Sequence, residues 1–296
     1  MSVPAAYLAV IMVWSTTPLG VKWSAYGISP AAGAFARILL ATALGWMLVR
    51  LAGVAVPWHR KALRVYGYSN IGVFVGLLCT YIGAQTISSG LISIMYGMSP
   101  VISAVLARFL LNEPPFSLSK WLAMVTGVLG LVVVFRHEVV ALQGSLTGFA
   151  LVLFSVFCFS FSGVMLKREG PVVQPFAQTV GALTLATPLY GIAAAIMGLQ
   201  FESIQPRTVG AIVYLAVFGS FVGFFCYFYI LKHLQASTVA LTTMITPVLA
   251  VTLGALLNGE VITHNLLAGA AMIATALLLY YWGDALFAKL TLPRVT

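Results

Sequence analysis

The chain has 296 residues, of which 61% are apolar and only 7% are charged, whereas about a quarter of the residues in a soluble domain carry a charge. This composition excludes an ordinary soluble globular protein. The net charge of +9 does not indicate nucleic-acid binding, because the basic residues are scattered between apolar segments and form no single stripe.

Ten apolar segments follow one another, separated by clusters of charged residues, Gly and Pro. Their approximate ranges are 5–24, 30–50, 65–84, 88–111, 119–135, 147–166, 175–198, 208–231, 237–257 and 265–286. Roughly 20 apolar residues cross a bilayer as a helix, and these runs are too evenly apolar for the alternating strands of a barrel. The first segment lacks a preceding basic residue and a clear cleavage pattern, so we expect a span and no cleaved signal peptide. The sequence predicts an all-α integral membrane protein with ten transmembrane helices.

The Lys and Arg residues predict an orientation. With the N-terminus inside, eleven of them lie in cytoplasmic loops, against Lys22, Arg136 and Arg207 on the other face. We therefore expect a multi-pass protein of the inner (plasma) membrane with both termini in the cytoplasm.

The third and fourth segments recur in the eighth and ninth at a constant offset of 147 residues. The identical pairs are Gly72/Gly219, Phe74/Phe221, Val75/Val222, Gly76/Gly223, Cys79/Cys226, Pro100/Pro247, Val101/Val248, Leu106/Leu253, Leu110/Leu257 and Glu113/Glu260. A weaker match at another offset sets Gly20 and Val21 against Gly163 and Val164. The pattern predicts two five-helix repeats, 1–140 and 141–296. Because five is odd, the second repeat enters the membrane from the opposite side, and such inverted repeats are typical of carriers that expose a midplane site to each side in turn.

Polar residues recur at helical spacing in the fourth and ninth segments. They are Ser89, Ser93, Tyr96, Pro100 and Ser103, and then Thr238, Thr242, Thr243, Thr246 and Pro247. A proline within a span frees a backbone carbonyl, which can face a cavity. From these stripes we select Ser93, Tyr96, Pro100, Thr242, Thr243 and Pro247 as cavity candidates. The alternative is that the hydroxyls bond to their own backbone or hold helices together.

Aromatic residues are frequent where these helices would converge. The candidates are Trp14, Tyr81 and Tyr96 in the first repeat and Phe157, Phe161 and Tyr227 in the second. Ser15 and Thr16 join them because they follow Trp14 in a polar stretch that is prone to kink. Most aromatic residues in membrane proteins are packing or interface anchors, and that alternative stays open for each of them.

Arg37 lies about seven residues inside the second segment, where an ionisable side chain is a functional candidate. Its alternatives are snorkelling to the interface and a structural bond to helix carbonyls. No Asp or Glu lies in the middle of a segment, which disfavours a carboxylate proton relay and a site for organic cations. A neutral to mildly positive cavity suits a zwitterion, a carboxylate-bearing metabolite or a neutral solute. Glu113 and Glu260 end the fourth and ninth segments, and because two prolines follow Glu113, we expect that residue to serve the start of the next helix, a structural role.

The sequence gives no indication of catalysis or of a cofactor. The four His residues share no ligand spacing, so no metal site is predicted. The three Cys residues lie within apolar segments, and an odd number in such places makes no disulfide framework. There is no nucleotide-binding glycine loop and no Ser-His-Asp set, so we predict neither catalytic residues nor an enzyme.

Several loose motifs carry a resemblance over nearly the whole chain. They are Trp14 to Lys22, Pro30 to Arg37, Ser99-Pro100-Val101 to Glu113, and the echo Thr246-Pro247-Val248 to Glu260. In order, spacing and duplication the chain resembles the EamA family of the drug/metabolite transporter (DMT) superfamily. The resemblance implies a cavity lined by spans one to four and six to nine, with spans five and ten outside, and substrates such as amino acids, sugars and other metabolites. Many members have Gly after the first-span Trp, whereas this chain has Ser15.

The predicted function is secondary transport of a small metabolite by alternating access. An amino acid or a related zwitterion or organic acid is the favoured substrate, with export or exchange as the direction. The alternatives are a multidrug or other solute exporter of the same fold, a membrane-embedded lipid-modifying enzyme and a channel. The expected partners are a small-molecule substrate and the lipid bilayer, with no nucleic acid, and the expected state is a monomer or a weak homodimer.

Overall fold

The computed structural model describes residues 2–112, 116–136, 145–198, 204–234, 239 and 242–291, including their side chains except at 243–245 and 285–291. Helices account for most of these residues. In chain order they are α1 (Val3–Trp23), α2 (Pro30–Leu51), α3 (Arg60–Asn70), η1 (Ile71–Gly76), α4 (Leu77–Gly83), α5 (Ser89–Tyr96), α6 (Ser99–Leu110), α7 (Leu118–Phe135), α8 (Leu146–Glu169), α9 (Pro175–Met197), α10 (Pro206–Tyr214), η3 (Leu215–Val222), α11 (Gly223–His233), α13 (Thr242–Asn258) and α14 (His264–Thr291).

The prediction of an all-α protein with about ten membrane spans is confirmed. Among the described residues, nine helical segments are long and apolar enough to cross a membrane, and the helix Thr246–Asn258 is apolar but shorter. It belongs to the ninth predicted segment, which begins outside the described residues. The third span is longer than expected, because helix begins at Arg60 and continues through η1 and α4.

Proline and glycine set many of the helix ends. Proline occupies the first turn of α2, α6, α9 and α10, where its missing N–H leaves no intrahelical bond unmade. Gly170 and Gly198 follow α8 and α9 with positive φ angles of 74° and 87°, a conformation that costs glycine little. These local signals explain why the spans could be delimited from the sequence.

The fourth span is two helices and not the single kinked helix that the proline suggests. α5 ends at Tyr96, Gly97 and Met98 form a turn, and α6 begins at Ser99 with Pro100 in its first turn. The amide of Met98 bonds to the carbonyl of Met95 at 3.0 Å, which closes a tighter turn than an α-helix has. The break lies well inside the span.

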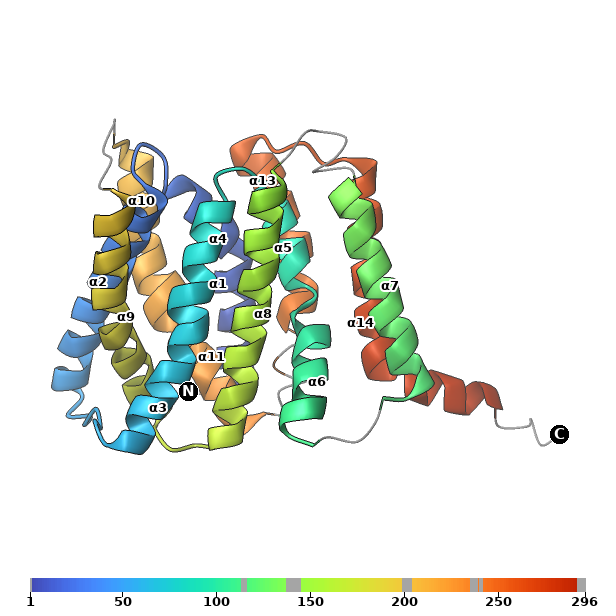
Figure 1. Ribbon diagram of the computed structural model, residues 1–296, viewed down its shortest axis with the longest axis horizontal. Helices are drawn as coiled ribbons and strands as arrows, with labels where there is room; N and C mark the ends of the chain where they lie inside the picture. The colour runs from blue at the N-terminus through green and yellow to red at the C-terminus, as the bar shows by residue number, and fades with distance from the viewer. Residues whose placement is uncertain are drawn as a thin grey trace.

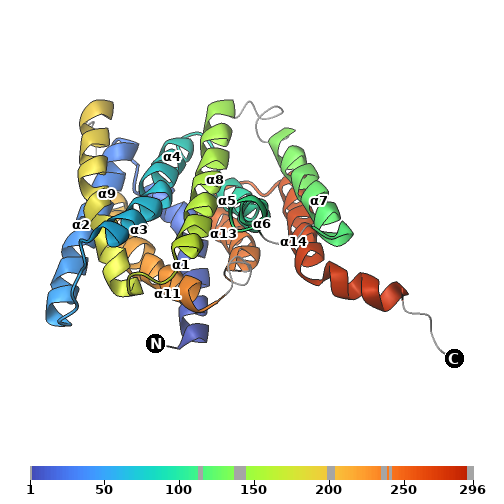
Figure 2. The same cartoon turned by 60° about the horizontal axis from the view of Figure 1, so that its bottom comes forward.

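The helices of the two halves pair in an internally equivalent pattern. α2 packs along α9, and α7 packs along α14 to one side of the other helices (Figures 1 and 2). α1 contacts α11 and α13 of the second half, and correspondingly α8 contacts α4 and α6 of the first half. In Figure 1, α1 ascends from the N-terminus, whereas α8, the first helix of the second half, descends. The fifth and tenth spans lie at the periphery, as the family resemblance implied.

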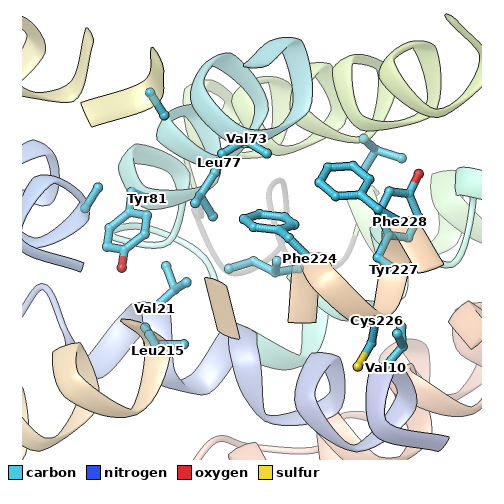
Figure 3. Packing of buried hydrophobic residues seen from close by; sticks show 14 of the residues in the cluster. Val10, Val21, Val73, Leu77, Tyr81, Leu215, Phe224, Cys226, Tyr227 and Phe228 are labelled. Carbon is cyan, nitrogen blue, oxygen red and sulfur yellow. The ribbon is translucent and has the colours of Figure 1, made fainter. Parts of the chain in front are cut away.

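The third and eighth spans each contain a π-helical segment, and the two segments overlap under the 147-residue offset. They are η1 and η3, and they include the equivalent residues Gly72 and Gly219. A π-helical segment widens a helix locally and occurs frequently at functional sites. In the first turns of α4 and α11, which follow them, lie Leu77 and Phe224, which are also equivalent and lie next to each other in the buried cluster of Figure 3.

Candidate functional site

A cavity of about 90 Å³ lies at the convergence of the two halves. Its walls come from α1, α2, the third and fourth spans, α8, η3, α11 and α13. A buried water needs about 10–15 Å³ by a comparable measure, so the space holds several small groups. Three equivalent pairs contribute to the walls, namely Gly72/Gly219, Leu77/Phe224 and Ser99/Thr246. The cavity therefore lies where the internal repeat places matching residues on both sides.

A group of aromatic rings lines this cavity. The rings of Trp14 and Phe159 meet edge to face with centroids 5.3 Å apart, and Tyr96 lies 6.1 Å from Phe159. Tyr227 lies 5.2 Å from both Trp14 and Phe159. Such rings present apolar faces that can contact an apolar or flat ligand.

A triangle of hydroxyl groups joins three spans beside the cavity. The Tyr96 hydroxyl lies 2.6 Å from Ser155 Oγ and 3.0 Å from Thr80 Oγ1, and Thr80 and Ser155 are 2.7 Å apart. Thr80 Oγ1 also donates to the carbonyl of Gly76 at the end of η1. The triangle fixes the Tyr96 ring against α4 and α8.

Arg37 lies in the wall of the cavity and is only 1% exposed. Its Nε donates to Ser220 Oγ at 2.7 Å, and its Nη1 is buried with no hydrogen-bond partner. Gly219 makes room for the guanidinium, because a Cβ there would lie 3.0 Å from Nη2. Ser93, 3% exposed, also lines the cavity and has a buried Oγ without a partner.

A second, smaller cavity of about 40 Å³ shares Trp14, Ser99 and Phe159 with the first. Its other residues include Ser103, Leu231 and Thr242. This second cavity lies toward the end of the bundle that carries Arg108, Lys167 and Lys232. Those basic residues come later in the same helices, α6, α8 and α11, that line the cavity. The contact between Trp14 and Phe159 thus lies between the central cavity and this end.

At the opposite end of the bundle, Glu260 of the second half forms hydrogen bonds to α5 of the first half. Its carboxylate accepts from Ser89 Oγ at 2.8 and 2.9 Å and from the backbone N–H groups of Ser89 and Gly90 at 3.1 and 3.2 Å. Lys22 Nζ lies 3.8 Å away and donates to the carbonyl of Ile87. A carboxylate at a helix N-terminus is stabilised by the unpaired N–H groups there. Together Glu260, Ser89, Gly90 and Lys22 form what we call the Glu260 clamp.

Glu260 caps a helix of the other half. It lies beyond the end of α13, and its carboxylate accepts from the first N–H groups of α5. Its repeat equivalent, Glu113, lies outside the described residues.

Some predicted site residues lie together and others do not. Trp14, Arg37, Ser93 and Tyr96 line the central cavity, and Trp14, Tyr227 and Thr242 line the second. Thr16 faces a separate pocket and lies 2.6 Å from the Tyr214 hydroxyl.

The remaining predicted residues lie off the walls of these cavities. Ser15 Oγ donates to the carbonyl of Ile11, and the Tyr81 hydroxyl accepts from Ser24 within the core. Pro100 and Pro247 are buried at helix packing positions. The side chain of Thr243, like Thr238 of the predicted stripe, lies outside the described residues.

The choice of Phe157 and Phe161 needs correction. Phe157 is 43% exposed and stacks on Phe154 and Phe161 along the outer face of α8. Phe159, which the sequence interpretation did not select, faces Trp14 instead. Two residues along a helix turn the side chain by about 200°, so the prediction took the wrong face of this span.

Several cavity residues were missed, and the repeat could have indicated some of them. Gly72 and Gly219 were noted as identical but not as wall residues. Ser99 and Thr246 precede the two matched prolines, and both line the cavity. Thr17 lies in the polar stretch from which Ser15 and Thr16 were selected, whereas Thr80 has no signal in the sequence.

Comparison with known proteins places this architecture among transporters. The model of the EamA-like transporter family matches residues 2–136 and 146–282. An uncharacterized transporter of Archaeoglobus fulgidus is 26% identical over 89% of this chain and 92% of its own length. The uncharacterized inner membrane transporter YedA of Escherichia coli K12 is 25% identical over 95% and 91%, and protein PagO of Salmonella typhimurium is 22% identical over 90% and 88%.

A solved crystal structure has the same fold. It aligns with a TM-score of 0.69 at 16% sequence identity and covers 98% of this chain and 99% of the other.

Proposed function

Because the chain belongs to the EamA-like transporter family, we propose that it is a secondary transporter that carries a small metabolite across the inner membrane by alternating access. The favoured substrates are an amino acid or a related zwitterion or organic acid, moved by export or exchange. The inner membrane is proposed from the similarity to YedA and from the cytoplasmic excess of Lys and Arg.

The observation that carries this proposal is the composition of the cavity walls. Gly72/Gly219, Leu77/Phe224 and Ser99/Thr246 face one space from the two halves. If the halves are inverted, as the opposite directions of α1 and α8 in Figure 1 support, exchanging their conformations converts a cavity open to one side into a cavity open to the other.

A carrier in one of its conformations is closed at one end and more open at the other, and the two ends of the bundle differ in this way. At the end that we propose to face the outside, from the charge distribution, the Glu260 clamp joins the halves. Toward the cytoplasmic end, the second cavity continues beyond Trp14 and Phe159. This difference supports a carrier closed at its outer end.

Counterflow in proteoliposomes tests the proposal. Vesicles containing the purified protein are loaded with single unlabelled amino acids and organic acids, and uptake of the radiolabelled compound is measured. A carrier gives saturable uptake that rises when the same compound is present on the opposite side. Saturable uptake without trans-stimulation would indicate a channel, and no uptake across a broad metabolite panel would reject the proposed substrate classes.

A further inference from the structure

We infer that the central cavity binds a carboxylate group of its substrate through the guanidinium of Arg37. This inference rests on the proposed function, and it adds both the substrate class and the residue that recognises it. The recognised group is a single carboxylate carried on an apolar or flat body.

The charge of Arg37 is uncompensated in the described part of the chain. Arginine stays protonated in proteins, and a buried ion is costly unless it is paired. Of the described carboxylates, Glu169 pairs with Arg64, Glu260 with Lys22, and Asp284 accepts from Ser119. None of them contacts Arg37, whose Nη1 has no partner.

The guanidinium is held by neutral groups that leave its donors available. Ser220 takes only the Nε hydrogen, at 2.7 Å, which fixes the plane of the group without neutralising it. Gly219 of the π-helical segment η3 provides the space beside Nη2. A positively charged fork with an unused donor in a cavity wall matches the two oxygens of a carboxylate, because both can accept from one guanidinium.

Two further features limit the ligand. Ser93 Oγ, the other unpartnered buried group of the cavity, offers one neutral hydrogen bond. The rings of Trp14, Tyr96 and Phe159 add an apolar surface to the same wall. With a single cation in the described wall, a dianion would leave one charge unpaired, whereas a monocarboxylate with an apolar body suits both the guanidinium and the rings.

The test compares carboxylates with their neutral amides. The probes are acetate and acetamide, 3-phenylpropionate and 3-phenylpropionamide, and L-phenylalanine and L-phenylalaninamide. Binding to the purified full-length protein in detergent is measured by isothermal titration and by the ligand-induced rise in unfolding temperature. The amino-acid pair separates a zwitterionic ligand from a simple anion, since only the former carries an ammonium group.

We expect at least one carboxylate to bind the wild-type protein at least tenfold more tightly than its amide. Arg37→Gln should abolish that preference and leave amide binding within about threefold, a loss that corresponds to about 1.4 kcal/mol or more. Arg50→Gln is the matched control, because Arg50 lies on the same helix at its exposed end. The inference is overturned if no pair shows a carboxylate preference, or if Arg37→Gln retains it.

A second variant covers the case in which Arg37→Gln does not fold. Arg37→Lys keeps the charge but loses the fork, and we expect a several-fold weaker carboxylate preference. An unchanged preference would contradict recognition by the guanidinium. The binding assay does not depend on transport, so the two proposals can fail separately. Carboxylate-selective binding without counterflow would reject the proposed carrier function and retain the Arg37 site. Counterflow of acids and amides at equal rates would retain the carrier function and reject the Arg37 site.

Discussion

Phe157 and Phe159 are two residues apart on α8 but have different surroundings. Phe157 stacks with Phe154 and Phe161 on the outer face, in the position of a lipid-facing side chain. Phe159 meets Trp14 and Tyr96 where the two cavities join. A phenylalanine side chain can therefore be removed from either face of α8, and only removal of Phe159 should change the cavity.

We predict that Phe159→Ala alters transport while Phe157→Ala does not. Loss of the Phe159 ring removes the edge-to-face contact with Trp14 and opens the junction of the cavities, so KM or the maximal rate should change at least fivefold. Phe157→Ala should remain within twofold of the wild type. Counterflow rates normalised to folded protein, assessed by gel filtration, provide the measurement. Equal effects of the two substitutions would place the substrate path elsewhere.

The sequence could not distinguish these two faces, for a physical reason. α8 is apolar on all sides, since one side faces lipid and the other faces neighbouring helices, so hydrophobicity does not define its rotation. By contrast, Arg37 and Tyr96 could be selected because a charged or polar group is exceptional inside a span.

The hydroxyl of Tyr96 is expected to contribute to stability separately from its ring. Tyr96→Phe keeps the aromatic wall but removes the contacts with Ser155 and Thr80. Hydrogen bonds between membrane helices contribute about 0.6 kcal/mol on average and up to about 1.7 kcal/mol. We expect a loss in this range in the free energy of unfolding, measured by titration with a denaturing detergent. Thr126→Val is the control, because that hydroxyl bonds only within its own exposed helix surface, and a larger effect there would contradict the assignment.

At the scale of elements, the short helix α5 links the cavity to the end of the bundle that we propose to face the outside. Its N-terminus is held by the Glu260 clamp, and its other end carries Ser93 and Tyr96 into the cavity. The turn at Gly97 and Met98 separates α5 from α6. A movement that released the clamp would therefore displace cavity residues together with the outer end.

We predict that Glu260→Gln increases access to the cavity from outside. A neutral amide has one acceptor oxygen in place of two and loses the charge that Lys22 and the α5 N-terminus stabilise. The reporter is Thr17→Cys, a cavity position, with Cys79, Cys158 and Cys226 replaced by Ala. Labelling of intact cells by a membrane-impermeant thiol reagent should rise several-fold.

The control for the clamp is another carboxylate that accepts from a serine of a neighbouring helix. Asp284 accepts from Ser119 where α14 packs against α7 at the periphery of the bundle, and neither residue lines the cavity. Asp284→Asn should leave Thr17→Cys labelling unchanged. Unchanged labelling in Glu260→Gln would remove the clamp from the proposed gating mechanism.

The elements themselves were largely predictable. Spans appear in sequence as long apolar runs because lipid requires every backbone group to be bonded within the segment, and the described helices follow that pattern. The two π-helical segments and the division of the fourth span were not predictable, since they depend on how neighbouring helices fill the space beside Gly72, Gly97 and Gly219. The Glu260 clamp depends on contacts between distant segments and had no local signal.

At the scale of the whole molecule, the pairing of helices follows the repeat. The contacts of α1 with α11 and α13 have counterparts in those of α8 with α4 and α6, and the contact of α2 with η3 has a counterpart in that of α9 with α3. The two largest interfaces, of α7 with α14 and of α2 with α9, join equivalent spans. Such a pattern favours an exchange of conformations between the halves, because these main interfaces have equivalents. The proposed carrier mechanism requires, in addition, that the two halves enter the membrane from opposite sides.

Opposite insertion can be tested at the first turns of α1 and α8. In the background with Cys79, Cys158 and Cys226 replaced, Ser2→Cys and Thr147→Cys place a thiol at the start of each half, and both positions are exposed. We expect Ser2→Cys to react with an impermeant reagent only in inside-out vesicles and Thr147→Cys only in intact cells. A cysteine at Arg50, at the end of α2 that the distribution of Lys and Arg predicts to be cytoplasmic, serves as the reference for the inner side. Reaction of both test positions from the same side would show parallel halves, for which exchange of conformations could not move the cavity from one face of the membrane to the other.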